Sequence, residues 1–289
     1  MDYRPFGQTG IELSVIGLGG LLARCEGFEG HPPPDEKRNI YLRSKELGIN
    51  LFDMGYGDEI HIPDELKGSS GDHHFSLKVG GPPADELEGI VDRHLANIRR
   101  DAIDILRVHR KNFIEDQALF DKTLQLKQAG KIRSICTIRH YEEDLEAYAE
   151  NGPDEGADAD LVIYNYVCRW QEPGLRMSDE AGKGVLIMKA LGGQWIHWED
   201  QVRTDWSNAD KEKIVELSPI GEDMRPDLGL VYPIVNGPWH ELADPGESTV
   251  RTEKAIGWIL ENEAVDCILV AVASVEELEE NLGIGAPVG

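Results

Sequence analysis

Short runs of apolar, β-branched residues recur along the chain and alternate with amphipathic stretches of helical spacing. The runs have the length of buried strands and cover residues 13–19, 50–53, 74–79, 103–108, 131–137, 160–165, 184–191 and 266–272. Apolar residues repeat at helical spacing in 34–48, 84–98, 249–262 and 274–282. This alternation predicts an α/β fold, a (β/α)8 TIM barrel that forms a single domain over residues 1–289.

Two segments lie outside the alternation. Residues 2–13 (DYRPFGQTGIEL) predict a short N-terminal hairpin that turns at Gln8, Thr9 and Gly10. Residues 192–247 follow the seventh strand and are too aromatic for a disordered segment, so they predict a long lid loop over the barrel mouth. A doubly wound open sheet is the alternative fold, but no predicted strand is followed by the GxGxxG pattern.

The charge balance restricts the partners of this chain. Its 54 acidic and 29 basic residues give a formal net charge of −25, which argues against binding to nucleic acid or to an anionic membrane. No apolar run suits a membrane span and no secretory signal is visible. The four cysteines never form CxxC, so we expect reduced thiols, a cytosolic protein and no metal site.

Ionisable residues stand at the ends of three consecutive predicted strands. Asp53 ends the second strand, Lys78 lies near the end of the third and His109 follows the fourth, while Tyr56 lies on the loop that Asp53 opens. Each has an ordinary structural explanation on its own, as a turn cap, a surface lysine, a rim histidine or a packed tyrosine. Because the carboxyl ends of barrel strands meet at one rim, the four together predict an active site.

The chemistry of these four side chains suits a carbonyl group. A lysine ammonium within hydrogen-bonding reach lowers the pKa of a phenol from about 10, and a carboxylate keeps that lysine charged. A neutral imidazole can donate a hydrogen bond to a carbonyl oxygen, and the phenol can protonate that oxygen as it becomes an alkoxide. None of these groups supplies a hydride, so a redox reaction requires a cofactor.

The chain resembles the aldo-keto reductase family over nearly its whole length. The segments that carry the resemblance are RPFGQTGIELSVIGLGG, GINLFD, LKVGG, AIDILRVH, GKIRSIC, IYN, GVLIMKALGG and SVEELEEN, and MKALGG with His140 is similar to a bacterial branch. The resemblance implies that Tyr56 is the general acid and that Lys78 lowers its pKa. It also implies that Asp53 pairs with Lys78 and that His109 orients the substrate. The implied activity is NAD(P)-dependent reduction of an aldehyde, ketone or sugar-like carbonyl to an alcohol.

The chain departs from the family pattern at the loop that carries the tyrosine. The family usually separates its Asp and Tyr by four residues, whereas only Met54 and Gly55 intervene here. A residue spans roughly 3.5 Å, so the shorter loop is expected to move the phenol by several ångströms. A misplacement of about 1 Å can cost about a hundredfold in rate.

The positions that the family uses for the nicotinamide also differ. Ile138 and Arg139 stand where the family usually has a polar pair after the fifth strand. Leu161 stands in place of the expected glutamine, and Met188 stands in place of the aromatic residue that stacks on the nicotinamide. Polar or aromatic groups that remain available for the cofactor or substrate are Arg139, Asn165 and, in the lid, Trp195, His197 and Trp198.

At the adenine end the resemblance favours NAD over NADP. Glu277 stands where members that prefer NADP have an arginine, and a glutamate repels a 2′-phosphate but can accept hydrogen bonds from a 2′,3′-diol. The pyrophosphate is expected against backbone N–H groups. The residues assigned to the cofactor are Gly19, Gly20, Arg139, Asn165, Met188, Leu191, Gly192, Ser274, Glu277 and Asn281; for Asn281, a solvated helix end is an equal alternative.

Three functions remain open on these observations, because a fold alone does not settle function. The preferred one is an NAD(P)-dependent oxidoreductase with a small carbonyl or alcohol substrate. The second is a reductase fold with a degenerate cofactor site that acts as a ligand-binding or regulatory subunit. The third is non-redox chemistry at the same rim, such as elimination or epimerisation with a nicotinamide that is recycled in place.

Overall fold

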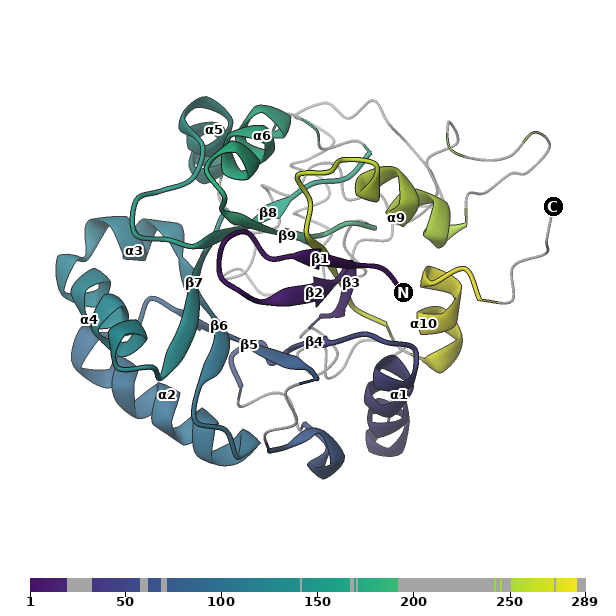
Figure 1. The fold of residues 1–289 in the computed structure, drawn as a ribbon, viewed down its shortest axis with the longest axis horizontal. Helices are drawn as coiled ribbons and strands as arrows, with labels where there is room; N and C mark the ends of the chain where they lie inside the picture. Colours follow the sequence, from purple (N-terminus) through teal and green to yellow (C-terminus); the bar gives the residue numbers. More distant parts are fainter. Residues whose placement is uncertain are drawn as a thin grey trace, which may run out of the picture.

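Parallel strands close into a barrel in the order β10-β3-β4-β5-β6-β7-β8-β9 (Figure 1). This computed structural model describes residues 1–19, 33–57, 62–68, 72–140, 142–166, 169, 171–191, 242, 245, 251–272 and 274–284. The barrel strands are β3 (Ile16–Leu18), β4 (Leu51–Asp53), β5 (His74–Gly80), β6 (Ile103–His109), β7 (Ile132–Ile138), β8 (Ala159–Ile163), β9 (Gly184–Met188) and β10 (Cys267–Val270). Each predicted strand is present, and the predicted TIM barrel is confirmed.

The predicted N-terminal hairpin is also confirmed. Strands β1 (Tyr3–Pro5) and β2 (Glu12–Ser14) pair antiparallel, and the hairpin lies across the middle of the barrel in Figure 1. Phe6 is fully buried, and its ring packs so closely on Gly184 at the start of β9 that a Cβ there would overlap it. The hairpin therefore closes the amino-terminal end of the barrel, opposite the rim where the strands end.

Amphipathic helices surround the barrel. They are α1 (Pro34–Glu46), α2 (Ala84–Ile98), α3 (Arg110–Glu115), α4 (Gln117–Gln128), α5 (Glu142–Asn151), α6 (Glu172–Glu180), α9 (Thr252–Leu260) and α10 (Val275–Asn281), with a short 3-10 helix at Asp64–Leu66. The four helices predicted from apolar spacing are α1, α2, α9 and α10. The predicted cap of α10 is present, since the Ser274 hydroxyl accepts a hydrogen bond from the Glu277 N–H at 3.2 Å.

Burial on both faces explains why the strands are continuous apolar runs. Residues 103–108 of β6 and every residue of β8, β9 and β10 are buried, because the barrel interior covers one face and the helices cover the other. Cys136 and Cys267 are free, buried thiols. Among the described residues, no helix is long and apolar enough to cross a membrane. The predicted lid lies outside the described residues, apart from Leu242 and Pro245.

A half-buried carboxylate directly before β10 makes the stability of the barrel depend on pH. Burial raises the pKa of Asp266 to about 7, although this carboxylate accepts a 2.8 Å hydrogen bond from the Val185 N–H. An acid whose pKa is raised by folding contributes stability that is complete below its unfolded pKa and is lost as pH rises through the folded pKa.

We therefore expect Asp266→Asn to become progressively more stable than the parent protein between pH 4 and pH 7, by up to about 2–4 kcal/mol. The measurement is the free energy of urea unfolding at several pH values across this range. Asp101→Asn, at an exposed position, is the control and should follow the parent profile. A constant difference between Asp266→Asn and the parent would contradict the assignment.

Candidate active site

A tight turn connects the end of β4 to Tyr56. The Gly55 N–H donates to the Asp53 carboxylate at 2.9 Å, and the Gly57 N–H donates to the Met54 carbonyl at 2.8 Å. Gly55 and Gly57 have φ values of +53° and +84°, in the left-handed region that favours glycine. Two glycines therefore let this loop, although two residues shorter than the family pattern, reverse direction directly after Asp53.

The turn brings Tyr56 against Lys78 of β5. The Lys78 Nζ lies 4.7 Å from the centroid of the Tyr56 ring, and the Lys78 N–H donates to the Gly55 carbonyl at 2.7 Å. The backbone of β5 thus anchors the turn beside the lysine. Tyr56 is half-buried, whereas Lys78 has only 8% of its surface exposed. The shortened loop therefore keeps the phenol next to the ammonium group.

A bulge at the end of β5 brings His109 into the same place. The pairing of β5 with β6 shifts register between Lys78 and Gly80, and such bulges change the direction in which side chains point. A Cβ built on Gly80 would lie 3.5 Å from Cε1 and 3.8 Å from the hydroxyl of Tyr56, and 4.0 Å from Cδ2 of His109. Tyr56 and His109 thus approach the same glycine, and Lys78 lies beside the Tyr56 ring.

Asp53 is buried and accepts several hydrogen bonds. Its Oδ1 accepts from the Ser76 hydroxyl at 3.1 Å and forms an ion pair with Arg107. Arg107 stands opposite Lys78 in the β5–β6 register, so it adds a second positive charge beside the predicted lysine. The sequence analysis missed Arg107, although a charged residue inside the apolar run IDILRV was a visible signal. The pairing of Asp53 with Lys78 stays a prediction.

Arg139 belongs to a buried polar network beside the rim. Its Nε donates to Asp160 at 2.7 Å, its Nη2 to Asp154 at 2.8 Å, and its Nη1 to the Asp144 carbonyl at 3.3 Å. The guanidinium also lies 4.6 Å from the centroid of the Tyr148 ring. Since all three of its nitrogens donate to protein oxygens, this side chain has little capacity left for a cofactor. Its assignment to the cofactor site stays a prediction.

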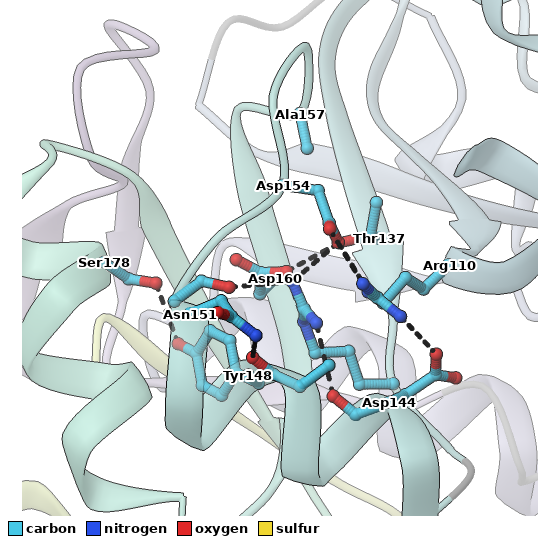
Figure 2. A network of polar contacts seen from close by, with 12 residues as sticks. Arg110, Thr137, Asp144, Tyr148, Asn151, Asp154, Ala157, Asp160 and Ser178 are labelled. Carbon is cyan, nitrogen blue, oxygen red and sulfur yellow. Dashed lines mark hydrogen bonds and ion pairs between the residues drawn. The ribbon is translucent and has the colours of Figure 1, made fainter.

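Arg110 joins the same network from the neighbouring strand end. Figure 2 shows Arg110 between two aspartates: its Nε and Nη2 bind Asp154 at 2.8 and 3.0 Å, and its Nη1 binds the Asp144 carboxylate at 3.1 Å. Arg110 and Arg139 therefore share Asp154, and we call these three residues the arginine clamp. Burial raises the pKa of Asp160, which is held by Arg139 and by the Thr137 hydroxyl at 2.6 Å.

The remaining predicted cofactor residues lie on the other arc of the rim. Asn165 follows β8, Met188 ends β9, Leu191 lies three residues later, and Ser274, Glu277 and Asn281 follow β10. Gly19 follows β3, and a Cβ there would lie 2.9 Å from the Val270 carbonyl oxygen, so this glycine permits close packing with β10. Gly20, Gly192, Trp195, His197 and Trp198 lie outside the described residues.

The side chains on this arc fit a dinucleotide in their chemistry. Asn165 is buried and donates to the Lys189 carbonyl at 2.9 Å, which fixes an amide group at the rim. Asn281 is also buried, with 5% of its surface exposed, and Ser274 adds a hydroxyl. Amide and hydroxyl groups are suitable partners for the carboxamide, ribose and adenine of a nicotinamide dinucleotide.

A family model and two known proteins match this chain. The family model described as "Aldo/keto reductase family" matches residues 77–287. The uncharacterized oxidoreductase YqkF of Bacillus subtilis (strain 168) is 23% identical, with 98% of this chain and 90% of that protein covered. L-galactose dehydrogenase of Arabidopsis thaliana is also 23% identical, with 98% and 87% covered.

Solved structures share the fold at lower identity. The holo form of aldo-keto reductase AKR11C1 from Bacillus halodurans has a TM-score of 0.67 at 19% identity, with 98% of this chain and 90% of that chain covered. An aldo-keto reductase from Klebsiella pneumoniae in complex with NADPH has a TM-score of 0.61 at 14% identity, with 97% and 89% covered.

The chain belongs to the aldo/keto reductase family, since the family model matches more than half of it. It is an NAD(P)-dependent oxidoreductase that uses NAD(P)H, and the family to which it belongs acts on small-molecule carbonyl substrates.

Gly57 tests the turn that carries Tyr56. A Cβ at this position would overlap the His94 ring, and the φ of +84° is strained for any other residue. We expect Gly57→Ala to lower the free energy of unfolding by about 1–3 kcal/mol and to lower kcat/KM, because the phenol moves with the turn.

The matched control is Gly89→Ala, an exposed position in α2 with open space around it, where alanine should add up to about 1 kcal/mol. Urea unfolding and steady-state kinetics of both variants are the measurements. A Gly57→Ala variant with parental stability and activity would show that the turn is not constrained as described.

Proposed function

We propose that this chain reduces a substrate carbonyl to an alcohol with a nicotinamide cofactor, and that Tyr56 is the proton donor. The observation that carries the proposal is the approach of Tyr56 and His109 to Gly80 at the barrel rim, with Lys78 beside the Tyr56 ring. The cofactor supplies the hydride, and the side chains of Tyr56 and His109 supply the proton and hold the carbonyl oxygen.

Each residue has a distinct part in the proposed reaction. The Tyr56 hydroxyl gives its proton to the carbonyl oxygen as negative charge develops there, and the Lys78 ammonium beside the ring stabilises the resulting phenolate. The ion pair between Asp53 and Arg107 links the ends of β4 and β6 and keeps them ordered. The His109 imidazole holds the carbonyl oxygen within reach of the phenol.

The alternative, a ligand-binding or regulatory subunit, has one observation in its favour. Arg139, at a position that the family uses for the nicotinamide, is engaged by Asp144, Asp154 and Asp160. A protein of this kind would still bind the dinucleotide but would not reduce an aldehyde, so measurements of cofactor binding and of turnover separate the two functions. We also propose that the chain forms a single catalytic domain.

Lys78 provides the test of the proposed chemistry. We expect Lys78→Met to lower kcat by about 100-fold or more, because the phenol loses its positive neighbour, while the Kd for the cofactor changes by less than about threefold. Turnover with an aldehyde and titration of intrinsic fluorescence with NADH are the two measurements.

Lys111→Met in α3 is the control for this experiment, since Lys111 is exposed. A Lys78→Met variant with near-parental kcat would refute the proposed proton donor. A parent protein that binds NADH but reduces no aldehyde would favour the ligand-binding alternative.

Acidic residues around the start of α10 support a preference for NAD. The Val275 N–H donates to the carboxylate of Glu36, from α1, at 3.1 Å, and Glu277 is exposed on the first turn. Arg43 of α1 is engaged by Glu279 at 2.8 Å. A 2′-phosphate placed near this end of α10 would meet carboxylates, whereas a ribose diol can donate hydrogen bonds to them.

The expected outcome is tighter binding of NADH than of NADPH by the parent protein. Glu277→Arg should shift the ratio of the two dissociation constants toward NADPH by about tenfold. Fluorescence titration with both cofactors measures this ratio, and Glu180→Arg, at an exposed position in α6, is the control. Equal ratios in the parent and Glu277→Arg would exclude Glu277 as the residue that sets the preference.

A further inference from the structure

His140 places a second imidazole at the rim beside His109. His140 lies two residues beyond the end of β7, and His109 is the last residue of the neighbouring strand β6. Their rings meet edge to face, with centroids 5.9 Å apart and an interplanar angle of 83°. Because Tyr56 and His109 both approach Gly80, His140 is next to the group of residues proposed to hold the carbonyl.

The Nδ1 atom of His140 is buried and makes no hydrogen bond with the residues that the structure describes. Buried polar atoms are nearly always hydrogen-bonded, so a nitrogen in this condition beside an active site indicates a place for a ligand atom. The neighbouring side chains set its protonation. Burial, with the positive charges of Lys78, Lys189 and Arg107 and the adjacent His109, holds the pKa of His140 well below its usual range.

The arginine clamp fixes the backbone next to both histidines. Arg110 directly follows His109 and Arg139 directly precedes His140, and the two guanidinium groups bind the same Asp154 carboxylate at 2.8–3.0 Å. The labelled residues Arg110, Asp154 and Asp144 in Figure 2 show how this side of the rim is cross-linked. The spacing of the two imidazoles is therefore set before a ligand binds, which is the condition for selective recognition.

We infer that His140 binds the substrate together with His109, and that the pair selects carbonyl compounds with a hydroxyl group on the carbon next to the carbonyl. This inference rests on the proposed function. A neutral imidazole has one donor and one acceptor, and a hydroxyl can satisfy either, whereas an alkyl group satisfies neither. A hydrogen bond of about 3 Å from each ring reaches two oxygens on neighbouring carbons.

The competing substrate class is a 2-oxo acid or aldehyde acid. A carboxylate in the same place would be attracted by Lys78 and Lys189, both of which act on His140. A carboxylate only accepts hydrogen bonds, so Nδ1 of His140 would have to carry a hydrogen in order to bind it. Comparison of glycolaldehyde with glyoxylate distinguishes the two classes, and a higher kcat/KM for glyoxylate would overturn the choice of a hydroxyl.

The decisive experiment compares lactaldehyde with 2-methylpropanal, which has a methyl group in place of the hydroxyl. The parent protein should prefer lactaldehyde in kcat/KM by about tenfold or more. His140→Phe keeps a planar ring but has no nitrogen, so the loss in kcat/KM should be about tenfold greater for lactaldehyde than for 2-methylpropanal. Hydration of the aldehydes is the same for both proteins and cancels in this comparison.

His140→Asn is the matched variant, because its amide lies close to the place of Nδ1. We expect it to retain most of the preference that His140→Phe loses. Equal losses for both aldehydes in His140→Phe would show that His140 only supports the fold. Unchanged kinetics in both variants would show that it does not contact the substrate, and either result overturns the inference.

A binding measurement separates this inference from the proposed function. In the parent protein, the ¹⁵N resonance of His140 Nδ1, assigned with His140→Asn, should shift on saturation with propane-1,2-diol but not with 2-methylpropan-1-ol. If the protein reduces no aldehyde, the proposed function fails, and this spectrum still decides the role of His140. Equal shifts with both alcohols, or no shift with either, would overturn it.

Discussion

Closure of the barrel between β3 and β10 is the constraint on which the rest of the structure depends. The Gly19 N–H donates to the Val270 carbonyl at 2.5 Å, and a Cβ on Gly17 would lie 3.0 Å from Leu269 and 3.2 Å from Leu51. Side chains at these two positions would force the strands apart. With the seam closed, the strand ends form a ring, so the arc that carries the proposed catalytic residues faces the arc assigned to the cofactor.

The arc from β4 to β6, which carries the proposed catalytic residues, combines a constrained backbone with buried charged groups. The left-handed glycines of the 53–57 turn and the bulge in β5 place Tyr56 over Lys78, so the loop length that differs from the family is accommodated by backbone conformation. Burying charged groups is costly unless they are paired, and the Asp53–Arg107 and Arg139–Asp160 pairs meet this requirement. Ion pairs between neighbouring strands thus order the rim and also place charged groups there.

The local charge of the rim contrasts with that of the whole chain. The formal net charge is −25, yet Lys78, Arg107 and Lys189 all act on His140. In the proposed reaction, the positive charge at the barrel mouth stabilises negative charge that develops on a substrate oxygen. The excess of acidic residues elsewhere does not oppose it strongly, because solvent and salt screen distant charges. The composition therefore described the surface of this protein and said little about its active site.

The sequence by itself determined the strands, the hairpin and the rim positions of Asp53, Tyr56, Lys78 and His109. The strands follow from apolar periodicity, which acts over a few residues, and the rim positions follow from the general rule that the carboxyl ends of barrel strands converge. Only the tertiary structure decided the partners. Arg107 reaches Asp53 across 54 positions, and Asp154 joins two arginines that directly follow two different strands. Such contacts depend on register and side-chain direction after the barrel has closed, and no local pattern encodes them.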